Sequence, residues 1–259
     1  MKQILAFLSV VLLPLAVAAQ HSPVETMLLT GHGFYMPDPG SEPFVGRPLP
    51  DFRLTTFDGR TVTSASLRGK VVVLDFWATW CGWCKRLTAD LDRELGRRND
   101  PRTVILGVNC RESDPEAAAD YWRTSGWSFD AVWQGDELGR QLQACHPTVV
   151  VADAQGVIRW HSNGWSATKA REVALLTDYL HGDLELTPQA VRRAIDAGDG
   201  VRALFMVDLL IGGDPQSEAS LCGMRIEALR LLKHPETERY VEQVRRRYPA
   251  ALRETGPTN

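Results

Sequence analysis

The stretch that decides the fold is KVVVLDFWATWCGWCK, residues 70–85. It begins with VVVLDF, residues 71–76, a run rich in β-forming apolar side chains that is typical of a strand buried on both faces. It ends with Cys81 and Cys84, which are separated by two residues. After them a leucine recurs every four residues up to Gly96, which predicts a helix that stops there. The two cysteines therefore lie where a buried strand gives way to a helix.

This placement of the cysteine pair predicts redox chemistry. At a helix N-terminus, unpaired backbone N–H groups and the positive end of the helix dipole favour a thiolate. Cys81 is therefore predicted to have a lowered pKa and to act as the nucleophile. Cys84, one helical turn later, is within reach of disulfide geometry and can resolve a mixed disulfide on Cys81. We expect the pair to cycle between dithiol and disulfide.

Other roles for a Cys-x-x-Cys pair find less support. A zinc site needs two further ligands, and the chain has neither a second Cys-x-x-Cys nor a pair of histidines at zinc-finger spacing. His146, beside Cys145, is a conceivable partner of the pair in a copper or zinc site. A purely structural disulfide is the other alternative. We expect redox chemistry that uses no metal and no cofactor.

The composition limits the classes of protein. The 259 residues are 44% hydrophobic and 24% charged, which suits a globular protein with a core and argues against a disordered or fibrous chain. With 29 basic and 32 acidic residues, the net charge of −3 provides no electrostatic footprint for nucleic acid or an anionic membrane. Five cysteines are too few for a disulfide scaffold in a chain of this length.

From about Val45 to Gly182 the sequence resembles the thioredoxin superfamily, specifically its exported TlpA-like and ResA-like thiol–disulfide oxidoreductases, which are related to the AhpC/TSA redoxins. The segment GRPLPDFRLTTFDGRTVTSASLRGKVVVLDFWATWCGWCK is similar, in order, to the entry segment, hairpin, central strand and active-site helix of that family. The resemblance implies an α/β thioredoxin fold, with a central mixed sheet flanked by helices. It also implies that Cys81 is the attacking thiol and Cys84 the resolving thiol.

The same resemblance implies that Pro147 is the cis proline that faces the disulfide. X-Pro bonds are the only peptide bonds with a modest cis cost, and Pro147 directly precedes a predicted strand. A cis bond there would turn the backbone of His146 toward Cys81 and offer strand-like hydrogen bonds to a substrate peptide. We therefore predict that His146 binds substrate, with Trp80 as a flat apolar rim. From the residues alone, an ordinary trans proline at a strand start is the simpler interpretation.

Two carboxylates are candidates for proton transfer. Asp75 lies on the predicted buried strand, where loss of water raises the pKa and allows the carboxylate to accept the proton of Cys84. Thioredoxins carry Asp at the matching position, whereas many members of the exported branch carry Asn. Glu112 matches an acidic position near the cysteine pair in ResA-like proteins. A purely structural Asp75 and a solvated Glu112 remain alternatives.

The dipeptide between the cysteines, Gly82-Trp83, departs from the family pattern, which usually has Pro in the second place. This dipeptide helps to set the reduction potential of the pair, so both residues are predicted to tune it. Trp83 restores a backbone N–H that Pro lacks, and we expect it to donate a hydrogen bond toward the Cys81 sulfur. The direction of the resulting shift in potential stays open.

Three cysteines lie outside the pair. Cys110 and Cys145 are expected at the active-site edge of the sheet, with the central strand between them. Two strand spacings of about 4.8 Å exceed the separation of about 4.4 to 6.8 Å between the Cα atoms of a disulfide. We therefore expect buried free thiols rather than a bridge. Cys222 is expected in the core of a helical region.

The chain begins with the signature of a secretory signal peptide, assigned to residues 1–19. Lys2 precedes an apolar run that is shorter than the roughly 20 residues of a membrane-spanning helix, and small residues at Ala16, Ala18 and Ala19 form a cleavage pattern. We expect a periplasmic or otherwise exported protein without a membrane span in the mature chain. A lead-in segment rich in Gly and Pro follows, over residues 20–44.

Two folded parts are predicted beyond the lead-in: a thioredoxin-like domain over residues 45–182 and a small all-α C-terminal region over residues 183–259. The predicted order of elements in the first domain, after an initial hairpin, is βαβαββα, with a parallel start and an antiparallel end. The expected strands cover residues 71–76, 103–108, 148–151 and 157–160.

The predicted function is exchange of the Cys81–Cys84 dithiol/disulfide with protein or peptide thiols and disulfides outside the cytoplasm, mainly as a reductant. Reduction in an oxidising compartment needs an electron source, so a membrane-bound, thioredoxin-reducing partner is expected. An oxidant or isomerase role stays open. The alternative from another class is a redox-inactive thioredoxin-fold binding module, whose helical C-terminal region docks a partner.

Overall fold

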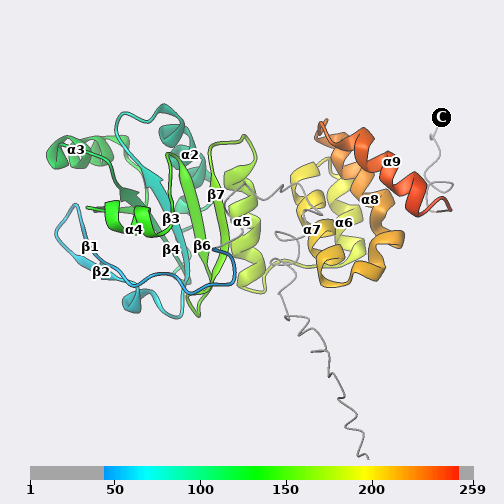
Figure 1. Cartoon of the computed structure of the whole chain (residues 1–259), viewed down its shortest axis with the longest axis horizontal. Coiled ribbons are helices and arrows are strands. Elements are labelled where there is room, and N and C mark those ends of the chain that lie inside the picture. Colours follow the sequence, from blue (N-terminus) through cyan, green and yellow to red (C-terminus); the bar gives the residue numbers. More distant parts are fainter. Residues whose placement is uncertain (1–43, 251–259) are drawn as a thin grey trace, which may run out of the picture.

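The computed structural model describes residues 44–250 of the chain (Figure 1). The predicted signal peptide (1–19) and the lead-in segment (20–44), except its last residue, lie outside this range, as does the end of the C-terminal region. Within the described range, no helix has both the length and the apolar character needed to cross a bilayer.

A mixed sheet of seven strands, in the order β2-β1-β5-β4-β3-β6-β7, forms the first part of the molecule. Its central strand β3 pairs in parallel with β4 and antiparallel with β6, which confirms the predicted mixed sheet. The strands are β1 (Arg53–Thr56), β2 (Thr61–Thr63), β3 (Val71–Trp77), β4 (Thr103–Asn109), β5 (Asp130–Trp133), β6 (Thr148–Ala152) and β7 (Ile158–Asn163).

Helices cover both faces of this sheet. Helices α2 and α5 pack on one face, and α4 packs on the other (Figure 1). The helical elements of this part are α2 (Gly82–Glu94), α3 (Pro115–Ser125), α4 (Asp136–Gln141) and α5 (Lys169–Leu180), with the 3₁₀ turns η1 (Ala65–Leu67) and η2 (Gly96–Arg98).

Strand β3 determines which side chains face the active-site helix. All seven of its residues are buried, and alternate residues point to opposite faces of the sheet. Val71 and Val73 pack in the core that contains α2 and α5. Leu74 and Phe76 pack in the core on the other face. By the same alternation, Asp75 points to the face that α2 covers.

Strand β5 is missing from the predicted order βαβαββα, so that order was wrong at this point. The strand is only four residues long and begins with an exposed Asp130, so it lacks the apolar run that predicts a buried strand. It forms because it pairs on both sides, in parallel with β4 and antiparallel with β1. Through β5 the first hairpin becomes part of the central sheet.

The C-terminal part of the described chain consists of helices, as predicted. One hydrophobic core runs from β3 through α2 and α5 into these helices, so they bury their apolar faces against the sheet-containing part as well as each other. The predicted boundary at residues 182/183 falls after α5 and stays a prediction. The helical elements are α6 (Pro188–Asp196), α7 (Gly200–Gly213), η3 (Pro215–Ser217), α8 (Glu218–Leu231) and α9 (Thr237–Arg247).

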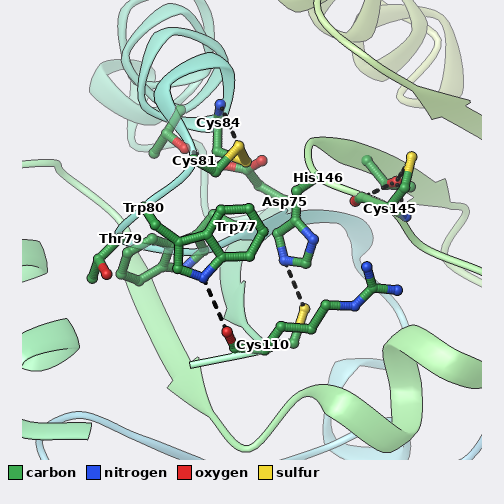
Figure 2. Close-up of a disulfide and its surroundings, with 12 residues drawn as sticks. Asp75, Trp77, Thr79, Trp80, Cys81, Cys84, Cys110, Cys145 and His146 are labelled. Atoms are coloured by element: carbon green, nitrogen blue, oxygen red, sulfur yellow. Dashed lines mark hydrogen bonds between the residues drawn. A yellow bond between two sulfur atoms is a disulfide. The ribbon is translucent and has the colours of Figure 1, made fainter. Parts of the chain in front are cut away.

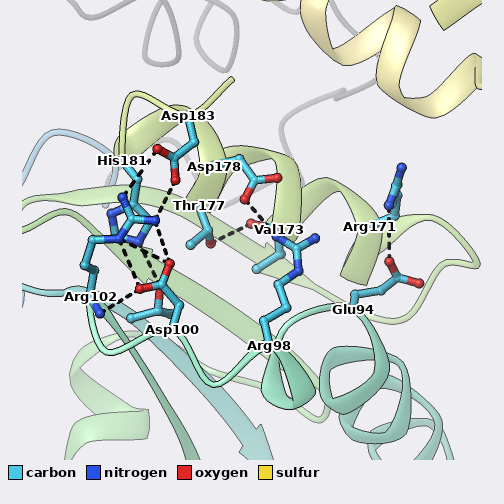
Figure 3. Close-up of polar contacts among 11 residues, drawn as sticks. Glu94, Arg98, Asp100, Arg102, Arg171, Val173, Thr177, Asp178, His181 and Asp183 are labelled. Atoms are coloured by element: carbon cyan, nitrogen blue, oxygen red, sulfur yellow. Dashed lines mark hydrogen bonds and ion pairs between the residues drawn. The ribbon is translucent and has the colours of Figure 1, made fainter. Parts of the chain in front are cut away.

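Polar contacts accompany this core at the surface (Figure 3). Arg102, just before β4, pairs with Asp183, just after α5, at 2.6 Å. Arg171 of α5 pairs with Asp199, the N-cap residue of α7, at 3.0 Å. Solvent-exposed ion pairs contribute little to stability, so burial in the shared core holds the helices in place.

Candidate active site

The two cysteines occupy the first turn of α2 and form a disulfide, with their Cα atoms 5.3 Å apart (Figure 2). Cys81 is the N-cap residue, and its sulfur accepts a hydrogen bond from the backbone N–H of Cys84 at 3.1 Å. Its residue exposure is 6%, whereas Cys84 is fully buried. Cys81 is therefore the less buried of the two cysteines, and a negative charge on its sulfur would face a backbone donor and the helix N-terminus.

The hydrogen bond to the Cys81 sulfur differs from the expected one. The donor is the N–H of Cys84 and not that of Trp83. The reason is helix geometry: an N-cap side chain accepts from the second or third residue of the helix, and here the third residue is aligned with it. The predicted tuning role of Trp83 therefore does not rest on this bond. Its side chain is 55% exposed.

Asp75 is fully buried beneath the active-site helix. Its Oδ2 accepts a hydrogen bond from the Thr88 hydroxyl at 2.5 Å, and its Oδ1 is buried without a hydrogen-bond partner. Thr88 lies one turn beyond Cys84 on the same face of α2, so this bond ties the carboxyl to the helix that carries the cysteine pair. Figure 2 shows Asp75 beside that pair. Burial raises the pKa of Asp75 to about 7, against a smaller lowering by the Thr88 hydrogen bond.

Replacing Thr88 by Val is expected to raise the pKa of Asp75 further. The variant removes the hydrogen bond that favours the ionised carboxylate while it keeps the size of the side chain. Thr88→Ser keeps the hydroxyl and is the matched control. Carboxyl ¹³C chemical shifts of Asp75 measured against pH give the titration directly. Equal midpoints for the Val variant and the wild type would show that the Thr88 hydroxyl has no influence on the carboxyl.

The loop after β4 supports the loop that carries Cys81. Glu112 accepts a hydrogen bond from the backbone N–H of Thr79 at 2.8 Å. Trp80 donates from its indole N–H to the carbonyl oxygen of Arg111 at 3.0 Å, while the residue stays 60% exposed. Glu112 thus contacts the loop before Cys81 at Thr79, two residues ahead of that cysteine. It binds the backbone there and does not bind a sulfur atom. Its predicted role in the reaction stays a prediction.

The segment before β6 faces the same loop. The His146–Pro147 peptide bond is cis, as the family resemblance implied. The His146 ring lies 5.1 Å from the Trp80 ring, and its Nε2 is 3.3 Å from the Cys110 sulfur (Figure 2). Burial, aided by the positive charge of Arg111, lowers the pKa of His146. Burial raises the pKa of Cys110 to about 12, so this thiol stays protonated and is a poor nucleophile.

Two of the three remaining cysteines match their predictions. Cys110 and Cys222 are buried free thiols. Cys145 is also free, but it is exposed, so the prediction of a buried thiol was wrong for this residue. The reason is the turn that leads into β6, in which Thr148 bonds both the backbone N–H and the carbonyl oxygen of Cys145 and leaves the residue at the surface.

The geometry can carry out dithiol–disulfide exchange. A cysteine at a helix N-terminus and a second cysteine bonded to it one turn later are the parts that such exchange requires, and a buried carboxyl lies beneath the same helix. Within residues 44–250, no group of three or more His, Cys, Asp or Glu side chains is arranged to hold a metal ion. Fold and site together define a thiol–disulfide oxidoreductase with a thioredoxin fold.

Sequence comparison with known proteins agrees with this class. Residues 45–161 match the AhpC/TSA family. The chain is 35% identical to the thiol:disulfide interchange protein DsbE of Pseudomonas fluorescens biotype C, over 49% of this chain and 71% of that protein. It is 29% identical to DsbE of Allochromatium vinosum, over 45% of this chain and 65% of that protein. A solved thiol:disulfide interchange protein from Chlorobium tepidum TLS matches at 24% identity and a TM-score of 0.44, covering 50% of this chain and 93% of the other.

The chain therefore belongs to the thioredoxin superfamily, in its TlpA/ResA-like branch of thiol–disulfide oxidoreductases.

Proposed function

We propose that the protein exchanges its Cys81–Cys84 pair with cysteines of protein or peptide substrates through a mixed disulfide on Cys81, and that it acts mainly as a reductant. The observation that carries this proposal is the unequal burial of the two bonded cysteines. Cys81 keeps 6% of its residue surface exposed and accepts a hydrogen bond from a backbone N–H, whereas Cys84 is fully buried. Attack by Cys81 followed by resolution by Cys84 is the order that this arrangement supports.

The first step starts from the reduced protein. The Cys81 thiolate attacks one sulfur of a substrate disulfide, a bond forms between the two proteins, and the other substrate sulfur leaves as a thiolate. The N–H of Cys84 and the start of α2 stabilise the Cys81 thiolate before the attack.

The second step releases the substrate. Cys84 loses its proton to the buried Asp75 carboxylate and attacks the Cys81 sulfur, which restores the Cys81–Cys84 disulfide. The second substrate sulfur leaves as a thiolate and takes a proton from solvent. Two electrons have then passed from the protein to the substrate. A carboxyl with a pKa of about 7 is well suited to accept a proton near neutral pH.

The remaining predicted site residues hold or orient these groups. The backbone of His146 and Pro147 and the exposed ring of Trp80 form the surface on which a substrate peptide lies beside Cys81. Glu112 holds the Thr79 backbone and with it the loop before Cys81. Gly82 and Trp83 tune the reduction potential of the pair.

Export and a membrane-bound electron donor complete the proposal. They rest on the predicted signal peptide and on the resemblance to the exported branch of the superfamily. A reductant outside the cytoplasm must be reduced again after each cycle, and the proposed partner is a membrane protein that delivers electrons to thioredoxin-like domains. The binding-module alternative gains no specific support, because the cysteine pair is intact and bonded.

Insulin reduction by dithiothreitol tests the activity. The mature protein is expected to accelerate it, and a Cys81→Ala/Cys84→Ala double variant is the control. Equilibration with a glutathione series then gives the reduction potential of the Cys81–Cys84 pair and tests whether the protein reduces or oxidises its substrates. A potential near that of thioredoxin, about −270 mV, marks a reductant, and a potential near about −120 mV marks an oxidant. No acceleration over the control would favour the binding module.

A further inference from the structure

Two stacked indole rings, one exposed and one partly buried, lie beside the cysteine pair. Trp83, between the two cysteines, stacks on Trp165, which lies in the loop between β7 and α5; the ring centroids are 5.2 Å apart and the rings are inclined by 24°. Trp83 is 55% exposed, and Trp80, on the other side of Cys81 in the sequence, is 60% exposed. Exposed tryptophan side chains next to a reactive cysteine favour contact with a partner.

A guanidinium group lies against both rings. The central carbon of Arg86 is 5.4 Å from the Trp83 ring centre and 5.6 Å from the Trp165 ring centre, within the range of cation–π attraction. Arg86 is exposed, and none of the carboxylates of residues 44–250 forms an ion pair with it. The N–H groups of Arg86 are therefore oriented by the rings but not occupied by an acidic side chain.

The acidic residue nearest to Arg86 along the helix binds other side chains through both of its oxygens. Asp90, one turn further on α2, accepts a hydrogen bond from the indole N–H of Trp165 at 3.1 Å. Its other oxygen pairs with Arg93 at 2.8 Å. Asp90 thus holds Trp165 in place and does not form an ion pair with Arg86. Lys85, the neighbouring cation, lies 4.5 Å above the Tyr121 ring and adds positive charge to the same helical turn.

We propose that the surface formed by Trp83, Arg86 and Trp165 binds polypeptide substrates that carry a carboxylate side chain within a few residues of the reacting cysteine. A planar guanidinium presents a fork of N–H donors that matches a carboxylate in a bidentate manner. The indole rings contact the apolar part of the same segment, and they keep the guanidinium oriented before binding. This inference rests on the proposed function and adds the substrate class to it.

The test uses a set of otherwise identical ten-residue peptides, each with one cysteine held in a mixed disulfide with cysteamine. Asp, Asn or Lys is placed in turn at each position up to four residues from the cysteine. Rate constants for reduction by the reduced protein are measured at low salt. At one or two positions the Asp peptide is expected to react about ten times faster than the Lys peptide, with Asn in between.

Variants test whether the preference for Asp peptides over Lys peptides depends on the surface formed by Trp83, Arg86 and Trp165. Arg86→Gln is expected to reduce the Asp-to-Lys ratio to less than about twofold, and Arg86→Lys to leave an intermediate ratio because an ammonium group binds a carboxylate without the fork. Trp165→Ala is expected to weaken the preference as well. Arg123→Gln, an exposed arginine of α3 that pairs with Asp120, is the matched control and is expected to keep the full ratio.

Hydroxyethyl disulfide, which is small and uncharged, distinguishes failure of the proposed substrate preference from failure of the proposed oxidoreductase function. The Arg86 and Arg123 variants are expected to reduce it at the wild-type rate. Equal rates for Asp and Lys peptides, or an unchanged ratio in Arg86→Gln, would overturn the inference while leaving the oxidoreductase function intact. If the wild type reduced neither peptides nor hydroxyethyl disulfide, the proposed function itself would fail.

Discussion

The Cys84→Ala variant is expected to accumulate covalent adducts with its substrates on Cys81 and to lose turnover by a factor on the order of 10³ or more. Cys84 is bonded to Cys81 in the first turn of α2, so its attack on a mixed disulfide is intramolecular. An external thiol at millimolar concentration cannot match the effective concentration of a neighbouring group in the same fold. The adducts appear as bands of higher mass on gels and disappear with dithiothreitol.

Cys145 requires a control in that experiment because it is a free and exposed thiol. A Cys84→Ala/Cys145→Ala double variant is expected to keep all adducts, whereas Cys81→Ala/Cys84→Ala is expected to lose them. Cys145→Ala alone is expected to turn over insulin at the wild-type rate. Adducts that persist without Cys81 and vanish without Cys145 would show that the attacking sulfur has been assigned wrongly.

Replacing Asp75 by Asn is expected to remove a large pH dependence of stability. The pKa of Asp75 is raised by burial from its ordinary value of 3.8 to about 7. Between these two values the folded protein holds a proton that the unfolded chain releases, so the stability of the wild type decreases as the pH rises through this range and levels off above pH 7. The total decrease for this fully buried group is about 4 kcal/mol.

The Asn variant carries no charge at this position, so the part of the pH dependence that comes from Asp75 is expected to be absent over the same range. Urea unfolding of the oxidised forms at pH 4 and pH 8 measures the effect. The variant is expected to be the more stable protein at pH 8, and the two proteins are expected to be similar at pH 4. A constant difference between them at both pH values would show that Asp75 does not titrate in this range.

The same substitution tests proton transfer. Without the carboxylate, the attack of Cys84 is expected to slow by about 10²-fold near neutral pH, because general base catalysis contributes at least that factor. The release of substrate from a preformed mixed disulfide on Cys81 reports this step alone. A wild-type rate that does not depend on pH around 7, or an unchanged rate in the variant, would argue for a structural Asp75.

Much of the site is predictable because it depends on local patterns. The buried run of β3 and the start of α2 are adjacent in the chain, so the position of the cysteine pair between them follows from hydrophobic pattern and spacing. Burial of Asp75 follows from the same run. The cis bond at Pro147 was available only through the family resemblance, since a proline before a strand does not by itself determine its isomer.

Other features depend on contacts between distant segments. Strand β5 forms because β1 and β4 lie on its two sides. The hydroxyl that holds Asp75 comes from Thr88 of α2, and the ring that stacks on Trp83 comes from Trp165, far along the chain. Side-chain spacing within one element carries no information about such partners.

The order of residues alone thus predicts the chemistry of this protein, because two cysteines at a strand–helix junction are a local arrangement. The tertiary structure alone settles how that chemistry is controlled: which sulfur is buried, what surrounds the carboxyl beneath it, and which exposed rings and cations flank it. The reason is physical. Burial and electrostatic environment are set by neighbours that folding brings together from separate parts of the chain.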